Sequence, residues 1–189
     1  MLDMIRSYLD GIGGLVMRIP PEGIRRVTNT ILEAWRNGRR VMVFGNGGGS
    51  ATAAHFVCDL AKGTSAPGRR RLKAISLAEN VPLLTAWAND TDYTNTFGEQ
   101  LRNLVEPGDV VIGLSGSGMS PNVVNALKLA NEEGALTVLF SGFDGGEAAR
   151  VASESIIVPS SDMQQIEDVH LILAHIVFRC VREQMSSED

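Results

Sequence analysis

From residue 40 onward the chain alternates short, nearly continuous apolar runs with segments whose apolar residues have helical spacing. Runs rich in β-branched residues are typical of strands that are covered on both faces. A chain in which strand and helix alternate is expected to form a parallel, doubly wound sheet with right-handed crossovers. The predicted strands are Val41–Phe44, Leu72–Leu77, Val110–Leu114, Leu136–Phe140 and Ser155–Val158.

Helices are predicted between these strands, and two more precede the first one. Leu2–Arg18 has amphipathic spacing in spite of its glycines, and a second helix around Ile24–Trp35 ends at Asn37–Gly38. We expect an α/β fold, a three-layer sandwich on a five-stranded parallel sheet of the flavodoxin-like kind. Residues 1–189 should form one domain, with residues 1–38 as an N-terminal helical extension. The remaining helices are predicted at Ala51–Ala61, Val81–Trp87, Thr94–Leu104, Asn122–Glu133 and Asp162–Glu183.

Composition excludes several classes of function. A net charge of −5 and an isoelectric point near 5.2 argue against nucleic-acid binding, which needs a dominant basic surface. No apolar segment reaches membrane-spanning length, and charged residues interrupt the N-terminal apolar positions, so neither a membrane span nor a signal peptide is predicted. Cys58 and Cys180 lie in apolar helical patterns and are expected to be buried thiols. We expect a cytoplasmic protein without nucleic-acid or membrane partners.

The first predicted strand runs directly into a glycine-rich turn, Gly45–Ser50, and a helix follows. In an open parallel sheet, ligands bind at the carboxyl ends of strands, where glycines let a ligand approach the backbone and helix N-termini favour anions. The spacing matches neither the dinucleotide-binding fingerprint nor the phosphate-binding loop that requires a lysine. A substrate site is therefore predicted here. The alternative is a glycine turn that serves only a tight corner.

A second such turn, Ser115–Ser120, follows the third predicted strand, and Pro121 opens the next helix. Hydroxyl groups and backbone N–H groups directly before a helix can surround a phosphate without a lysine or a metal. Ser120 can also be explained as a helix cap. Capping leaves Ser115 and Ser117 unexplained, so we favour phosphate binding.

The three histidines fall in two predicted helices. His55 and Asp59 are four residues apart and lie on one helix face. Glu167 precedes His175 by two turns plus about 80°, so both reach one site only at its edges. Two imidazoles and two carboxylates suit either acid–base chemistry or a divalent metal such as zinc. His170 lies in an apolar run and is interpreted as a satisfied core residue.

Several motifs, taken in order, resemble the SIS (sugar isomerase) domain family, and most closely its phosphoheptose isomerase branch. The resemblance covers nearly the whole chain. The motifs are Gly45–Gly48, His55–Phe56, Ala88–Asp90 with Tyr93 and Phe97, Pro107–Asp109, Ser115–Ser120 and the segment from Val169 to His175.

The resemblance implies an SIS fold, a phosphorylated sugar as substrate, zinc as cofactor and a homotetramer with active sites between subunits. It implies phosphate contacts from Ser115, Gly116, Ser117 and Ser120. It implies sugar contacts from Asn46, Gly47, Gly48, Asn89 and Asp90, although Asn89–Asp90 is locally typical of a turn. His55, Asp59, Glu167 and His175 fall on the family's zinc positions. Asp59 and Glu167 also fall on substrate-binding positions, and Asp59 and His175 on those of the acid–base pair.

Four positions depart from the family pattern. One is Gly49, which stands where serine is common, with Ser50 one place later. Asp59 stands where glutamate is usual and is one methylene shorter, and Glu167 stands where glutamine is usual and adds a negative charge. Gly63 stands where a phosphate-site arginine is often found, so that Lys62 or an arginine of another subunit would have to replace it.

These observations lead to one principal hypothesis and two alternatives. The principal one is an aldose–ketose isomerase that converts sedoheptulose 7-phosphate to a heptose 7-phosphate through an enediol. The first alternative is a non-catalytic SIS-fold protein, similar to the tetrameric partner of the bacterial replication initiator. The second is a sensor or an isomerase for another sugar phosphate.

Overall fold

The centre of the fold is a five-stranded parallel sheet with the order β2-β1-β3-β4-β5. A computed structural model describes residues 1–188. The predicted parallel sheet is confirmed, and no strand end differs from the prediction by more than one residue. The strands are β1 (Arg40–Gly45), β2 (Lys73–Ser76), β3 (Val110–Ser115), β4 (Leu136–Ser141) and β5 (Glu154–Ile157).

The predicted helices are present, and one short helix was not predicted. This is α7, whose six residues are too few to show a helical period. The helix after β1 ends in a π-helical turn, η1 (Asp59–Gly63), and a 3₁₀ turn, η2 (Tyr93–Asn95), precedes α5. The helices are α1 (Leu2–Arg18), α2 (Pro21–Arg36), α3 (Gly48–Cys58), α4 (Val81–Asp90), α5 (Thr96–Arg102), α6 (Pro121–Glu132), α7 (Gly146–Val151) and α8 (Met163–Ser187).

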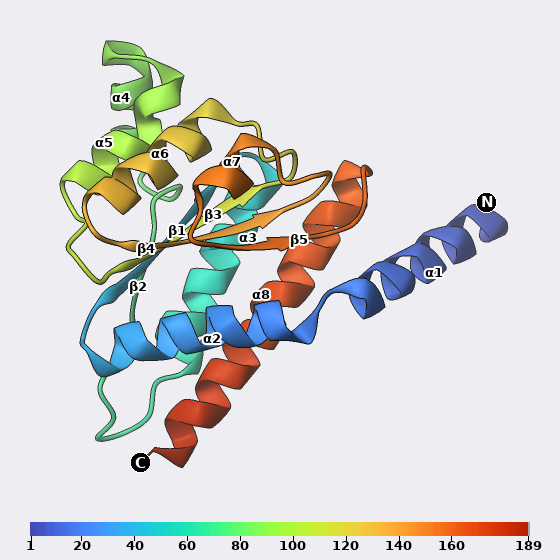
Figure 1. Ribbon diagram of the computed structural model, residues 1–189, viewed down its shortest axis with the longest axis horizontal. Helices are drawn as coiled ribbons and strands as arrows, with labels where there is room; N and C mark the ends of the chain where they lie inside the picture. Colours follow the sequence, from blue (N-terminus) through green and yellow to red (C-terminus); the bar gives the residue numbers. More distant parts are fainter. Residues whose placement is uncertain (189) are drawn as a thin grey trace.

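Alternation along the strands divides the core into two layers. In β1, Val41 and Val43 pack with α2, α3 and α8, whereas Met42 and Phe44 pack with α5 and α6 on the opposite face. Figure 1 shows these two helical layers on either side of the sheet. Because helices cover both faces of the sheet, side chains on both sides of each strand are apolar, which explains the continuous apolar runs in the sequence.

The first helix extends away from the sheet. Figure 1 shows α1 reaching beyond the body of the molecule. The Tyr8 hydroxyl on α1 donates a 2.7 Å hydrogen bond to Asp168 Oδ2 on α8, and this contact with a carboxylate raises the pKa of Tyr8 to about 12. Several large apolar side chains of α1 remain 64% to 84% exposed, namely Leu2, Met4, Leu9 and Met17.

The expectation that both cysteines are buried is wrong. Cys58 and Cys180 are exposed, because each lies on a side of its helix that faces away from the core, and both are free thiols. None of the helices in residues 1–188 is both long and apolar enough to cross a membrane.

The sheet order places the two glycine-rich turns side by side. From β1 the chain crosses to β2 on one side and then returns to β3 on the other side of β1. Gly45, the last residue of β1, pairs with Leu114 in β3, so both strands end at the same edge. Such a reversal of strand order opens a crevice at the carboxyl ends of the strands.

A close backbone approach holds the turn after β3 against the turn after β4. Gly118 has a positive φ of 67°, and a Cβ at this position would overlap the Gly145 carbonyl oxygen. The Ala148 amide also donates a 2.9 Å hydrogen bond to the Gly118 carbonyl. Only glycine satisfies both the conformation and the available space.

We predict that Gly118→Ala lowers the free energy of unfolding by about 2–4 kcal/mol, from left-handed strain and overpacking together. Gly68→Ala is a matched control, because Gly68 has a φ of 79° but an added methyl group would meet no atom within 4 Å. Gly68→Ala should lower the free energy of unfolding by only about 1 kcal/mol. Urea unfolding of both variants checks this, and equal losses would contradict the role of the close approach.

Candidate functional site

A cavity of about 160 Å³ lies where β1 and β3 end. It is formed by both glycine-rich turns and by the first turns of α8. The two turns that were predicted separately therefore line one pocket. Its walls are Asn46, Gly49, Leu114, Ser115, Gly116, Ser117, Ser120, Met163, Glu167 and His170.

The serine turn is arranged by its own hydrogen bonds. Ser115 Oγ accepts from the Gly118 amide over 3.1 Å and donates to Ser120 Oγ over 3.4 Å, and Ser117 Oγ accepts from the Met119 amide over 3.2 Å. Ser120 occupies the N-cap position of α6, but its side chain makes no capping bond. Its hydroxyl group instead lines the pocket. Hydroxyls at a helix N-terminus suit an anion such as phosphate.

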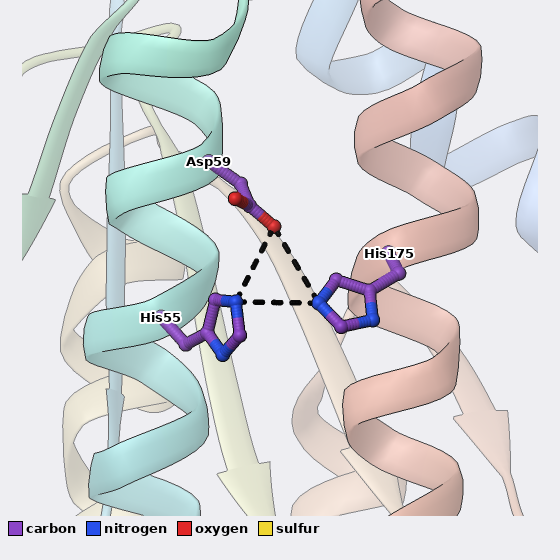
Figure 2. Close-up of side chains that lie close together, drawn as sticks. All are labelled: His55, Asp59 and His175. Carbon is purple, nitrogen blue, oxygen red and sulfur yellow. Dashed lines mark hydrogen bonds and ion pairs between the residues drawn. The ribbon is translucent and has the colours of Figure 1, made fainter.

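A second group of polar side chains lies between α3 and α8. His55 Nε2 is 3.3 Å from His175 Nε2, and Asp59 Oδ2 is 3.8 Å from the first nitrogen and 3.7 Å from the second. Figure 2 shows the three side chains pointing toward one another from the two helices. The predicted association of these three residues is confirmed as geometry.

Local sequence explains how these residues meet. His55 and Asp59 are four residues apart, so they share a helix face although Asp59 begins the π-helical turn. The two helices pack closely beyond the cluster, since a Cβ at Gly63 would lie 2.6 Å from the Phe178 ring. The arginine expected at this position in the family therefore has no room unless Phe178 moves. Lys62 on the same turn is exposed.

The three donor atoms fit a zinc ion. Tetrahedral zinc ligands at about 2.0–2.2 Å from the metal stand about 3.3–3.6 Å apart. The observed separations of 3.3, 3.7 and 3.8 Å lie close to this range. Two imidazoles and one carboxylate also leave a fourth position open, as catalytic zinc sites do.

The fourth predicted ligand, Glu167, lies outside this group. Its carboxylate is turned toward the start of α3, where a Cβ at Gly48 would overlap it. The spacing explains the separation, because eight residues of helix displace Glu167 from His175 by about 12 Å and about 80°. In this structure Glu167 belongs to the serine-lined pocket.

Asn89 and Asp90 also differ from expectation. They are the last two residues of α4 rather than a turn, and Asn89 Nδ2 donates to Asp90 Oδ1 over 2.8 Å. Both are exposed, and neither is among the described residues that line the pocket. Tyr93, a few residues later, contacts one residue of the pocket wall, because its hydroxyl group donates to Asn46 Oδ1.

His170 is buried as predicted, but only one of its two ring nitrogens has a hydrogen-bond partner among the described residues. The side chain is 1% exposed, it lines the serine pocket, and its Nε2 has no hydrogen-bond partner. Burial lowers the pKa of His170 to about 4, and a hydrogen bond with the Ser141 backbone only partly opposes this. The apolar run around His170 gave no sign that it borders the pocket, since a helical pattern does not show which side chain lines a cavity.

The chain is similar to known proteins over most of its length. A family model described as the SIS domain matches residues 7–142. The chain belongs to the SIS domain family. Its curated relatives include a phosphoheptose isomerase of Aquifex aeolicus, which is 40% identical over 84% of this chain and 83% of that protein. Another, from a Geobacter species, is 37% identical over 96% of this chain and 93% of that protein.

The fold agrees with a solved structure of this family. The phosphoheptose isomerase of Neisseria gonorrhoeae superposes with a TM-score of 0.88 at 27% identity, covering 95% of this chain and 97% of that one. The family and the SIS fold inferred from motifs are therefore both confirmed.

We predict that His170 makes stability depend on pH. Its folded pKa of about 4 lies below the ordinary 6.5, so the unfolded chain binds more protons between these values. The free energy of unfolding should therefore fall as the pH drops from about 6.5 to about 4, by an amount on the order of 3 kcal/mol. Urea unfolding at about pH 7.5 and about pH 4.5 measures the loss. His170→Gln should show a smaller loss, whereas an equal loss would assign the effect to other groups.

Proposed function

We propose that the protein catalyses aldose–ketose isomerisation of a phosphorylated sugar, sedoheptulose 7-phosphate, to a heptose 7-phosphate. The observation that carries the proposal is the His55–Asp59–His175 cluster in a chain whose relatives are named phosphoheptose isomerases. Those names favour an enzyme over a non-catalytic binding protein or a sensor. The sequence similarity extends over most of each relative's length, so the proposal concerns the whole described fold.

The serine-lined pocket is assigned to the phosphate. Ser115, Ser117 and Ser120 would supply hydroxyl groups, and Gly116 would allow the phosphate to approach the backbone. Asn46, Gly47 and Gly48, with Asn89 and Asp90, are assigned to the sugar, as the resemblance implies. His170 in the pocket and His175 in the cluster are five residues apart, about 7.5 Å along one helix. A ligand that uses both must extend over that distance.

Asp59 is assigned as the group that moves the carbon-bound proton. Its Oδ2 faces both histidines, which leaves Oδ1 for the substrate. The carboxylate takes a proton from C1 of the ketose, O2 gains a proton, and an enediol forms. The proton is then returned to C2 while O1 loses its proton, so that an aldehyde forms at C1 and no atom is gained or lost.

His175 is assigned to proton transfer at the sugar oxygens. A neutral imidazole that keeps Nε2 toward His55 and Asp59 can exchange protons through Nδ1, which donates to O2 and takes up the O1 proton as the aldehyde forms. His55, Asp59 and His175 would hold zinc, whereas Glu167 lies in the pocket wall and outside this set of donor atoms. When bound, zinc would polarise the substrate carbonyl as a Lewis acid.

We expect Asp59→Asn to lower kcat at least about 10²-fold, because an amide cannot take up the carbon-bound proton. The product from sedoheptulose 7-phosphate is followed by NMR, with protein treated with a chelator and with protein supplied with zinc. Asp144→Asn, on an exposed loop, is the control and should retain activity. Absence of an aldose product from the unaltered protein in both preparations would refute the heptose assignment, and full activity of Asp59→Asn would remove the assigned base.

We further propose that the active protein is a cytoplasmic homotetramer with sites completed between subunits. The exposed apolar side chains of α1 support this, since large exposed apolar patches mark contact surfaces. A groove of about 460 Å³ between α2 and α8 offers a matching apolar surface, with Ile24 and Ile176 in its walls. Exposed apolar surface on α1 would then be buried by a neighbouring copy.

Size-exclusion chromatography with light scattering should give about four times the 20.3 kDa chain mass. Leu9→Glu should give a smaller species, because it places a charge in the apolar patch of α1. Ser7→Glu adds the same charge about 200° around the helix and should leave the mass unchanged. A monomeric unaltered protein would refute the tetramer.

A further inference from the structure

The Asn46 amide, at the wall of the serine-lined pocket, is held by two side chains outside the assigned site. Asn46 Nδ2 donates to Asn122 Oδ1 over 2.9 Å, and Asn122 Nδ2 donates back to Asn46 Oδ1 over 2.8 Å. The Tyr93 hydroxyl donates to the same Asn46 Oδ1 over 2.9 Å. Asn122 is 1% exposed and Asn46 is half-buried, so a buried amide holds one that borders the pocket.

A backbone hydrogen bond determines which way round both amides lie. The Val123 amide donates to both the Ser120 carbonyl and Asn122 Oδ1, each over 3.0 Å. Because a backbone N–H can only donate, the Asn122 atom that it contacts must be the oxygen. The other Asn122 atom is then Nδ2, a donor, and the Asn46 atom that it contacts must in turn be the oxygen. The orientation of Asn46 is therefore set by the backbone of α6.

This arrangement leaves Asn46 with a hydrogen-bond donor, but no acceptor, for a ligand. Its Oδ1 accepts from Asn122 and from Tyr93, which occupies both lone pairs. Its Nδ2 uses one of two hydrogens among the residues that the structure describes. What Asn46 can present to a ligand is thus an N–H and not a carbonyl oxygen.

We propose that Asn122 is a positioning residue which, with Tyr93, fixes Asn46 as a hydrogen-bond donor to an oxygen of the sugar. The inference rests on the proposed function for the identity of the ligand. A donor at the sugar carbonyl would stabilise the negative charge that develops there as the enediol forms. An amide turned the other way would place its own oxygen against that charge.

The test compares the same substitution, asparagine to aspartate, at a buried and at an exposed position. Asn122→Asp keeps the shape of the side chain but replaces the donor to Asn46 Oδ1 by an oxygen, so Asn46 must turn or move. We expect kcat to fall about 10²-fold while KM changes much less. Asn103→Asp, at the exposed end of α5, should behave like the unaltered protein. A folded Asn122→Asp variant with unchanged kcat would overturn the proposal.

A double-mutant cycle separates positioning from a general effect on the fold. If Asn122 acts through Asn46, then Asn122→Asp should cost almost nothing further in an Asn46→Ala background. Additive losses would overturn the proposal. Should Asn122→Asp fail to fold, Tyr93→Phe replaces it in the cycle, since Tyr93 is 50% exposed. Loss of that one bond should lower kcat about 2- to 10-fold, and only when Asn46 is present.

A readout that needs no turnover keeps this inference apart from the proposed function. The side-chain amide signal of Asn46 in a ¹H–¹⁵N spectrum is identified by its loss in Asn46→Ala. Asn122→Asp and Tyr93→Phe should both shift that signal, and Asn103→Asp should leave it in place. These shifts without any isomerase activity in the unaltered protein would refute the proposed function and retain the orientation of Asn46. Isomerase activity without these shifts would support the proposed function and refute the proposed orientation of Asn46.

Discussion

The parallel pairing of β1 with β3 is the constraint on which the rest of the structure depends. Gly45 and Leu114 lie opposite each other in the register, so the turns that follow both strands leave the sheet at the same place. A Cβ at Gly45 would lie 2.7 Å from the Leu114 carbonyl oxygen, which shows how closely the two strand ends approach. This contact brings Asn46 and the serine turn into one pocket. Gly45 therefore allows the two strand ends to pack this closely.

The other half of the site depends on α8. Its buried face, which includes Ile166, Val169 and Val177, packs into the core layer that α2 and α3 share. Packing of this face directs Glu167 and His170 to the pocket and His175 to the cluster with His55. One helix thus contributes to both polar groups, and the same apolar contacts that stabilise the fold fix the separation between them.

Much of this arrangement could be predicted from the sequence, because it follows from local periodicity. The strand ends were accurate to one residue, since apolar runs end where polar or glycine residues begin. The pairing of His55 with Asp59 followed from helical spacing, whereas the meeting with His175 was implied by the resemblance to the SIS domain family. These features depend on residues that are close in sequence or on a topology with few alternatives.

What could not be predicted depends on the direction of single side chains. Glu167 and His175 share a helix, and only packing decides that the first turns toward Gly48 and the second toward His55. The free Nε2 of His170 and the amide pair of Asn122 are likewise invisible in a periodic pattern, because their surroundings come from distant segments. Burial of a polar residue, seen only in three dimensions, was the signal that sequence reasoning lacked.

The separation of the cluster residues along the chain has a consequence for folding. His55 and His175 are 120 residues apart and come from the first helix after β1 and the last of the described helices. Closing so long a loop costs entropy that is recovered only when the intervening sheet has formed. During synthesis, α3 emerges long before α8, and the two imidazoles remain apart until α8 docks. Assembly of this cluster is therefore a late event, and its presence reports that the core layer beneath it is complete.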